Sequence, residues 1–315
     1  MNTPLAAAAE DPFALDQPQA YARWRERKLE RYPRRVEDLV VEVRDPRNPR
    51  QSEIAAIQRI IGLANMAVYV SAFAGVADRQ LPRRLGERLG LLRVAGNPFA
   101  DEDGISALEA TPEKSALGYI PYSNRRLLWH TDGYYNTQQQ RIRAFILHCV
   151  HPATVGGENC LLDHEIAYIL LRDANPDYVK ALCRLDAMTI PPNDSAGMAP
   201  RPAVSGPVFA TDGGALHMRY TARTRSIEWR TDETLRAALQ FLNQILDAKS
   251  PYVFTLRLTG GQGLVCNNVL HGRSAFTNAE APAPGRLVYR ARYFDRVADG
   301  VATLGPFQQD NAGDE

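Results

Sequence analysis

The sequence predicts a mainly β protein in which a β-sandwich or jelly-roll core carries N-terminal and inserted helices. Short apolar runs of strand-like composition recur in both halves of the chain, and helical periodicity is concentrated before and between them. A doubly wound parallel sheet would need regular alternation of strands and helices, and it would usually carry a Gly-rich phosphate loop. The run Gly260-Gly261-Gln262-Gly263 precedes an apolar segment, so we interpret it as a turn.

The N-terminal half contains both predicted helices and predicted strands. Residues 17–36 are rich in Arg, Lys, Glu and Tyr and predict a solvated helix, whereas Ser52 and Glu53 open a helix with an apolar face. Residues 95–117 are polar and have no firm period, so we expect an irregular, lid-like insertion there. The remaining elements predicted in this half are strands at 39–43, 66–70 and 142–150 and a helix through Leu81, Leu85 and Leu89.

The C-terminal half shows clearer helix starts. Asp163 and the pair Asn175-Pro176 are typical of helix N-termini, and Thr231 opens a helix with a stripe of leucines. Prolines and glycines punctuate residues 191–214, which predict a long loop insertion. Strands are predicted at 216–220, 253–258, 263–269 and 286–294. We therefore expect a partly helical extension at 1–50, a single jelly-roll domain at 51–300 and a tail at 301–315.

The composition is that of a globular protein with no strong charge bias. The 37 Lys and Arg residues nearly balance the 36 Asp and Glu residues, which gives no indication of nucleic acid or an acidic membrane surface as a partner. The apolar runs are too short to span a bilayer, and the N-terminus lacks a basic segment followed by an apolar one. The four cysteines form no Cys-x-x-Cys pair, so we expect free thiols and a cytoplasmic location. The expected partner is a small-molecule substrate, and a homo-oligomer is possible.

The most informative motif is His130-Thr131-Asp132, with a second histidine, His271, much later in the chain. In an extended segment His130 and Asp132 lie on the same face, close enough to chelate one ion, and the third ligand then comes from another strand. Two imidazoles and one carboxylate form a facial triad that suits Fe(II), Mn(II) or Co(II) and leaves coordination positions open for catalysis. Zinc remains open on affinity alone, and a lone His-x-Asp pair often occurs by chance.

A pair of arginines near the C-terminus adds weight to the metal site. In the predicted strand at 286–294, alternation places Arg286 and Arg290 on the same face. Inward guanidinium groups need anionic partners, and a dicarboxylate co-substrate would accept the bidentate fork of an arginine. The alternative is an edge strand with both arginines in solvent.

Several motifs follow one another in the order His130-Thr131-Asp132, Gly156-Gly157-Glu158-Asn159, Asn268-Val269-Leu270-His271-Gly272-Arg273, Arg286 and Arg290. This ordered set resembles the taurine dioxygenase (TauD/TfdA) superfamily over roughly residues 50–296, and it is closest in form to the gamma-butyrobetaine hydroxylase and clavaminate synthase-like branches. The resemblance implies a double-stranded β-helix core, Fe(II) as cofactor, and 2-oxoglutarate and O2 as co-substrates, with succinate and carbon dioxide as products.

The resemblance also implies a role for each site residue. His130, Asp132 and His271 would be the catalytic iron ligands, and Arg286 would bind the distal carboxylate of 2-oxoglutarate. Asn159 stands where the family usually has Thr, and its amide could still donate a hydrogen bond to that carboxylate. Arg290 is expected near the primary substrate, as the counter-charge of an anionic group, and Tyr134 and Asn136 are expected to line the pocket. Arg290 could instead make a second contact to 2-oxoglutarate or an ion pair with an acidic residue. Asn268 would brace the strand that presents His271, or it is a turn or strand-end asparagine.

Three functions remain open at this point. The main hypothesis is a dioxygenase that hydroxylates, or oxidatively cleaves, a small polar, anionic or amino-acid-like metabolite. A metal-dependent hydrolase could use the same triad to activate water, but it would leave Arg286 without an anionic co-substrate. The third alternative is a noncatalytic metal- or ligand-binding jelly roll.

Overall fold

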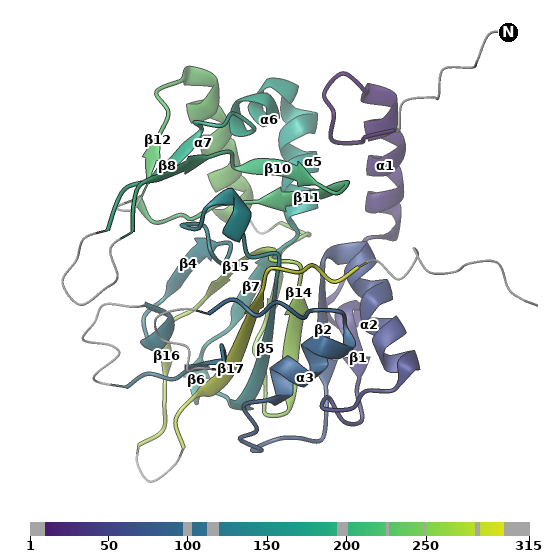
Figure 1. Cartoon of the computed structure of the whole chain (residues 1–315), viewed down its shortest axis with the longest axis vertical. Coiled ribbons are helices and arrows are strands. Elements are labelled where there is room, and N and C mark those ends of the chain that lie inside the picture. The colour runs from purple at the N-terminus through teal and green to yellow at the C-terminus, as the bar shows by residue number, and fades with distance from the viewer. Residues whose placement is uncertain are drawn as a thin grey trace, which may run out of the picture.

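The computed structural model describes residues 10–96, 103–111, 120–193, 201–224, 227–247, 250–280 and 284–298. These residues form a mixed α/β fold whose strands are mostly antiparallel (Figure 1). The larger sheet has six strands in the order β1-β2-β14-β5-β17-β3, and only β1 and β2 pair in parallel within it. Their bounds are β1 Val40–Glu42, β2 Met66–Val70, β14 Gln262–Cys266, β5 Ala144–His151, β17 Leu287–Tyr293 and β3 Ser106–Leu108.

A second sheet of four strands carries two of the predicted metal ligands. Its order is β13-β7-β15-β4, and every neighbouring pair is antiparallel. The strands are β13 Phe254–Leu256, β7 Asn159–Leu162, β15 Leu270–Arg273 and β4 Leu127–His130. Smaller sheets pair β16 Phe276–Thr277 with β6 Val155–Gly156, β10 Phe209–Asp212 with β11 Ala215–Met218, and β8 Met188–Ile190 with β12 Glu228–Trp229 and β9 Val204–Gly206.

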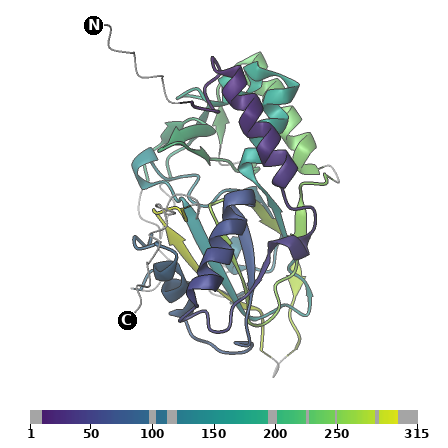
Figure 2. The ribbon, with the colours of Figure 1, turned by 90° about the vertical axis from the view of Figure 1, so that its right-hand side faces the viewer.

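The helices occupy two regions. Two of them, α2 and α3, lie against the six-stranded sheet, while α5, α6 and α7 pack together at the other end of the molecule with α1 alongside (Figures 1 and 2). The predicted caps operate here, since the side chains of Asp163 and Asn175 accept hydrogen bonds from Glu165 N and Asp177 N. The described helices are α1 Pro18–Arg31, α2 Gln51–Ala64, α3 Leu81–Arg88, α5 His164–Ala174, α6 Pro176–Leu182 and α7 Glu233–Asp247, with 3₁₀ turns at Val36–Leu39, Ile120–Tyr122 and Gln138–Gln140.

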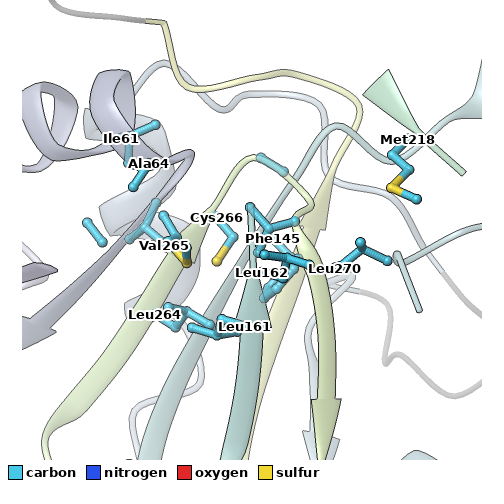
Figure 3. Packing of buried hydrophobic residues seen from close by; sticks show 14 of the residues in the cluster. Ile61, Ala64, Phe145, Leu161, Leu162, Met218, Leu264, Val265, Cys266 and Leu270 are labelled. Carbon is cyan, nitrogen blue, oxygen red and sulfur yellow. The ribbon is translucent and has the colours of Figure 1, made fainter. Parts of the chain in front are cut away.

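The core lies on both faces of the six-stranded sheet. Alternation along β14 sends Val265 toward α2 and sends Leu264 toward Leu161 of the four-stranded sheet (Figure 3). Burial of such side chains supplies the main driving force for bringing the two sheets together. Within the part of the chain that the structure describes, none of the helices is long and apolar enough to cross a membrane.

The structure differs from the sequence expectations in the two insertions. Parts of 191–214 are regular, because β9 pairs with β8 and β10 forms a hairpin with β11, while residues 194–200 lie outside the described residues. In 95–117 a short strand, β3, pairs with β17, and residues 97–102 and 112–119 lie outside the described residues. The predicted strand at 263–269 ends at Cys266, because Asn268 adopts a left-handed conformation with φ of 52°.

Candidate metal centre and active site

Two neighbouring strands bring the predicted triad together. His130, at the end of β4, and His271, in β15, are directly paired across the sheet, and their ring centroids lie 4.1 Å apart. Asp132 follows two residues beyond β4, and its Oδ1 lies 3.8 Å from His130 Nε2. One ligand atom from each of the three residues lies within 4.8 Å of the others, which is compatible with their holding a single ion.

Backbone carbonyls orient both imidazoles in the same way. Nδ1 of His130 lies 2.9 Å from Leu128 O, and Nδ1 of His271 lies 2.9 Å from Val269 O. A carbonyl can only accept, so each Nδ1 is assigned as the protonated donor, and each Nε2 keeps its lone pair for a metal. Such bonds fix the tautomer and the ring orientation of a metal-ligating histidine.

The protonation states also suit a cation. Burial, followed by the neighbouring His271, lowers the pKa of His130 to about 3, and burial lowers the pKa of His271 as well. Burial alone would raise the pKa of Asp132, but the guanidinium groups of Arg290 and Arg292 outweigh it and hold that pKa below its ordinary value. At neutral pH the site therefore offers two neutral imidazoles and one carboxylate, the donor set that Fe(II) accepts.

Asn268 fixes the loop that carries Asp132. Its Oδ1 accepts a hydrogen bond from Asp132 N at 2.8 Å, and its Nδ2 donates to Asp132 O at 3.0 Å and to Ile142 O at 2.6 Å. Asn tolerates the positive φ found here better than most residues. Asn268 thus fixes the backbone of Asp132, the predicted carboxylate ligand, and also precedes the strand of His271.

Strand β17 directs Arg290 and Arg292 to the side of the metal ligands. Arg290 Nη1 lies 3.2 Å from Asp132 Oδ1 and 3.4 Å from Oδ2, so this arginine is paired with a predicted iron ligand. Arg292 donates from Nη1 to Tyr135 Oη at 3.1 Å and from Nη2 to Gly96 O at 3.3 Å. This ion pair engages Nη1 of Arg290 and leaves its buried Nε, which has no acceptor among the described residues.

Arg286 precedes β17 and is buried, with no counter-ion among the residues that the structure describes. Its side chain is 7% exposed, and no hydrogen bond or ion pair among the described residues involves its guanidinium group. Arg273 lies beside it, and the two guanidinium groups are 4.7 and 5.2 Å from the ring centre of Phe276. Burial, and then the charge of Arg286, lowers the pKa of Arg273 to about 9. Such a cationic pocket is costly unless an anion occupies it.

The Gly156-Gly157 motif forms the turn next to this pocket. Both glycines have positive φ, and a Cβ on Gly156 would lie 2.1 Å from Ala275 O, so no other residue fits there without a backbone shift. A Cβ on Gly157 would lie 3.8 Å from Arg286 Nε. Asn159, buried at the start of β7, is directly paired with Arg273 of β15. The motif therefore places its asparagine directly beside Arg273, while Gly157 lies close to Arg286.

Tyr134 and Asn136 lie on the loop beyond Asp132. The Tyr134 carbonyl accepts a hydrogen bond from Arg219 Nε at 2.7 Å, and Asn136 Nδ2 donates to Gln140 O at 2.7 Å. Both residues line a cavity of about 20 Å³ that also borders Asp132, a volume sufficient for about one water molecule.

Arg273 and Arg292 are site residues for which sequence reasoning assigned no role. The alternation that grouped Arg286 with Arg290 also places Arg292 on that face, so the signal for Arg292 was present in the sequence. For Arg273 the sequence carried no comparable signal, because its position depends on the pairing of β15 with β7.

Comparison with known proteins identifies the family of this chain. The family model described as "Taurine catabolism dioxygenase TauD, TfdA family" matches residues 37–292. Among curated proteins no significant match was found.

Several solved structures share the fold. An asparagine oxygenase in complex with Fe(II), 2S,3S-3-hydroxyasparagine and succinate has 18% identity and a TM-score of 0.55, over 77% of this chain and 78% of that chain. The non-heme iron oxygenase OrfP with Fe, succinate and (3S)-hydroxy-L-Arg has 15% identity and a TM-score of 0.55, over 77% and 82%. PvcB from Pseudomonas aeruginosa has 14% identity and a TM-score of 0.54, over 82% and 87%.

Proposed function

We infer that this chain, which belongs to the TauD, TfdA family of taurine catabolism dioxygenases, hydroxylates or oxidatively cleaves a small polar metabolite that is anionic or resembles an amino acid. As a family member it is a non-haem iron, 2-oxoglutarate-dependent dioxygenase. Family membership favours this activity over the metal-dependent hydrolase and the noncatalytic binding protein. We also propose that its two main sheets form the double-stranded β-helix, or jelly-roll, core that was expected from the sequence.

The observation that carries the proposal is the triad of His130, Asp132 and His271 in a protein whose buried Arg286 has no acidic partner among the described residues. His130, Asp132 and His271 would hold Fe(II) through two imidazole nitrogens and one carboxylate oxygen. Bound iron would supply the redox chemistry that couples oxidative decarboxylation of 2-oxoglutarate to oxidation of the substrate. The protein groups would orient the reactants and exclude water.

Arg286 would bind the distal carboxylate of 2-oxoglutarate. Its burial and its lack of an acidic partner among the described residues support this role, because a carboxylate would satisfy the bidentate fork. Arg273 would add a second positive charge behind it. Asn159 would donate a hydrogen bond from its amide in place of the usual threonine hydroxyl.

The substrate class is supported by two of the structural neighbours. One was solved with hydroxyasparagine and the other with hydroxy-L-Arg, both of them amino acid products. In this chain Arg290 would meet an anionic group of the substrate with the N–H groups that Asp132 does not use. Tyr134 and Asn136 would line the pocket beyond the metal.

Turnover of the reconstituted protein tests the proposal directly. Protein loaded anaerobically with Fe(II) would receive 2-oxoglutarate, oxygen and single members of a panel of amino acids, sulfonates, phosphonates and betaines. We expect at least one compound to stimulate both oxygen uptake and succinate release. The matched control is Asp132→Ala under the same conditions. Product formation without 2-oxoglutarate would instead identify a hydrolase, and no iron-dependent succinate with any compound would refute the proposal.

A further inference from the structure

Two consecutive inward positions of β17 are arginines. Arg290 is directly paired with Leu147 of β5, and Arg292 with Phe145, which in turn contacts the ring of His271. The two arginines are 8% and 5% exposed, so both guanidinium groups are withdrawn from bulk water beside the metal ligands. Burial of two positive charges on one strand is unfavourable unless an anionic or hydrogen-bond-accepting group compensates for it.

The hydrogen bonds of both arginines are incomplete in the same way. The Nε–H groups of Arg290 and Arg292 are buried, and neither meets an acceptor within the described ranges. The groups that Arg292 does contact, Tyr135 Oη and Gly96 O, are both uncharged. Each arginine therefore retains a buried donor of the kind that binds an oxyanion side-on together with an adjacent Nη–H.

The charges that face the arginine pair are unbalanced. Asp132 is the only described carboxylate in contact with either guanidinium group. Bound Fe(II) would add two positive charges, and of the two carboxylates of 2-oxoglutarate one is assigned to Arg286. Arg292 shares the field of Asp132 with Arg290 but has no carboxylate in direct contact among the described residues. Buried charges are usually paired more closely than this.

We propose that Arg292 joins Arg290 to bind one oxyanion group of the primary substrate, so that Arg292 selects carboxylate, sulfonate or phosphonate compounds over neutral analogues. Tyr135 is a positioning residue, because its hydroxyl holds one Nη of Arg292. This inference rests on the proposed function and adds a specificity-determining residue to it. It also predicts that the substrate's anionic group lies between Asp132 and Tyr135.

A binding measurement tests the inference without turnover. The full chain would be loaded with Mn(II) and saturating 2-oxoglutarate, so that Arg286 is occupied. Calorimetry would then measure binding of methanesulfonate, methylphosphonate and acetate, with dimethyl sulfone as a neutral analogue of similar shape. We expect the wild-type protein to bind at least one oxyanion more tightly than dimethyl sulfone. The same affinity for the oxyanions and for the sulfone would overturn the inference.

Variants at three positions identify the responsible residue. Arg292→Gln should weaken oxyanion binding about 10- to 100-fold, the range of a hydrogen bond to a charged group, and leave binding of 2-oxoglutarate unchanged. Tyr135→Phe should cause a smaller loss in the same probes. Arg83→Gln, which removes an exposed arginine of α3 that pairs with Glu87, is the matched control and should have no effect.

Arg292→Lys keeps the inference testable if Arg292→Gln folds poorly. Lysine retains the charge but not the planar fork, so oxyanion selectivity should fall between that of the wild-type protein and that of the glutamine variant. Unchanged oxyanion affinity in both variants would refute the role of Arg292, and an equal loss for oxyanions and dimethyl sulfone would show that Arg292 is only structural. Failure of the proposed function would appear separately, as absence of iron-dependent succinate release from the wild-type protein.

Discussion

Asn268 holds Asp132 by both of its backbone polar groups, accepting from Asp132 N at 2.8 Å and donating to Asp132 O at 3.0 Å. The two residues are 136 positions apart in the sequence. Because Asn268 also lies three residues before His271, one amide side chain links the loop of the proposed carboxylate ligand to the strand of a proposed imidazole ligand. A bond of this type acts on the metal through its ligands.

Replacement of Asn268 should therefore weaken metal binding. Asn268→Gly removes the three side-chain hydrogen bonds. Glycine accepts a φ of 52° without strain, so a change in metal affinity would reflect the lost hydrogen bonds and not a strained backbone. We expect the affinity for Fe(II) to fall about 10- to 100-fold in an anaerobic titration. Asn65→Gly is the matched control, since Asn65 has a φ of 57°. A loss no larger than that of the control would argue against the brace.

The triad itself should be indispensable. His130→Ala and Asp132→Ala each remove one ligand of the predicted ion, and we expect a loss of succinate release larger than the 10- to 100-fold effect of removing a bracing residue. Circular dichroism should show a largely unchanged fold, because the ligands are not part of the main apolar core. Full iron-dependent activity in either variant would show that the assignment is wrong.

The parts of the fold that could be predicted from the sequence are those that depend on local sequence patterns. Strand 66–70 and the caps at Asp163 and Asn175 were predicted from short stretches of sequence, because alternation, apolar composition and side-chain capping are local properties. The strands β9 and β10 were missed. These two strands form by pairing with β8 and β11, which the local sequence does not reveal. The prolines and glycines of 191–214 therefore predict only a loop.

Part of the candidate site could also be predicted from the sequence. The grouping of His130, Asp132 and His271 could be inferred from residue types and order, and the structure brings the three together. Long-range contacts could not be inferred in this way. The pairing of Arg290 with Asp132 joins residues 158 positions apart, and the position of Arg273 beside Arg286 depends on the register of β15. Neither depends on a pattern within one element.

Arg286 should determine the requirement for 2-oxoglutarate. Arg286→Lys keeps the positive charge but loses the bidentate geometry, so we expect the KM for 2-oxoglutarate to rise about 10- to 100-fold at saturating iron, a change equivalent to about 1.4 to 2.8 kcal/mol. The measurement is succinate release as a function of co-substrate concentration. If that KM is unchanged, the carboxylate is bound elsewhere.

Buried His148 should make the protein less stable in acid. Burial lowers the pKa of His148 to about 4, so as the pH falls below 6.5 the unfolded chain takes up a proton that the folded chain does not. The stability associated with the neutral imidazole is complete above pH 6.5 and is lost as the pH falls toward 4. We expect His148→Asn to reduce the pH dependence of the free energy of unfolding by up to about 1.4 kcal/mol per pH unit in this window. Urea unfolding of metal-free protein would measure it, and parallel profiles for both proteins would contradict the prediction.

Arg290 is expected to act on both the metal ligand and the substrate, and the two effects can be separated. Its Nη1 contacts Asp132, whereas its buried Nε has no acceptor among the described residues. Arg290→Ala should therefore weaken binding of an anionic substrate about 10- to 100-fold and increase decarboxylation of 2-oxoglutarate that is not coupled to product. The assays require saturating Fe(II), because loss of the contact with Asp132 also loosens that ligand.

Two measurements separate these roles of Arg290. An iron titration reports on Asp132, and the ratio of succinate to hydroxylated product reports on the substrate. The KM for 2-oxoglutarate should stay near its wild-type value, since Arg286 remains in place. Loss of co-substrate affinity alone would instead make Arg290 a second contact for 2-oxoglutarate. A best substrate that carries no anionic group would likewise leave Arg290 with only its contact to Asp132.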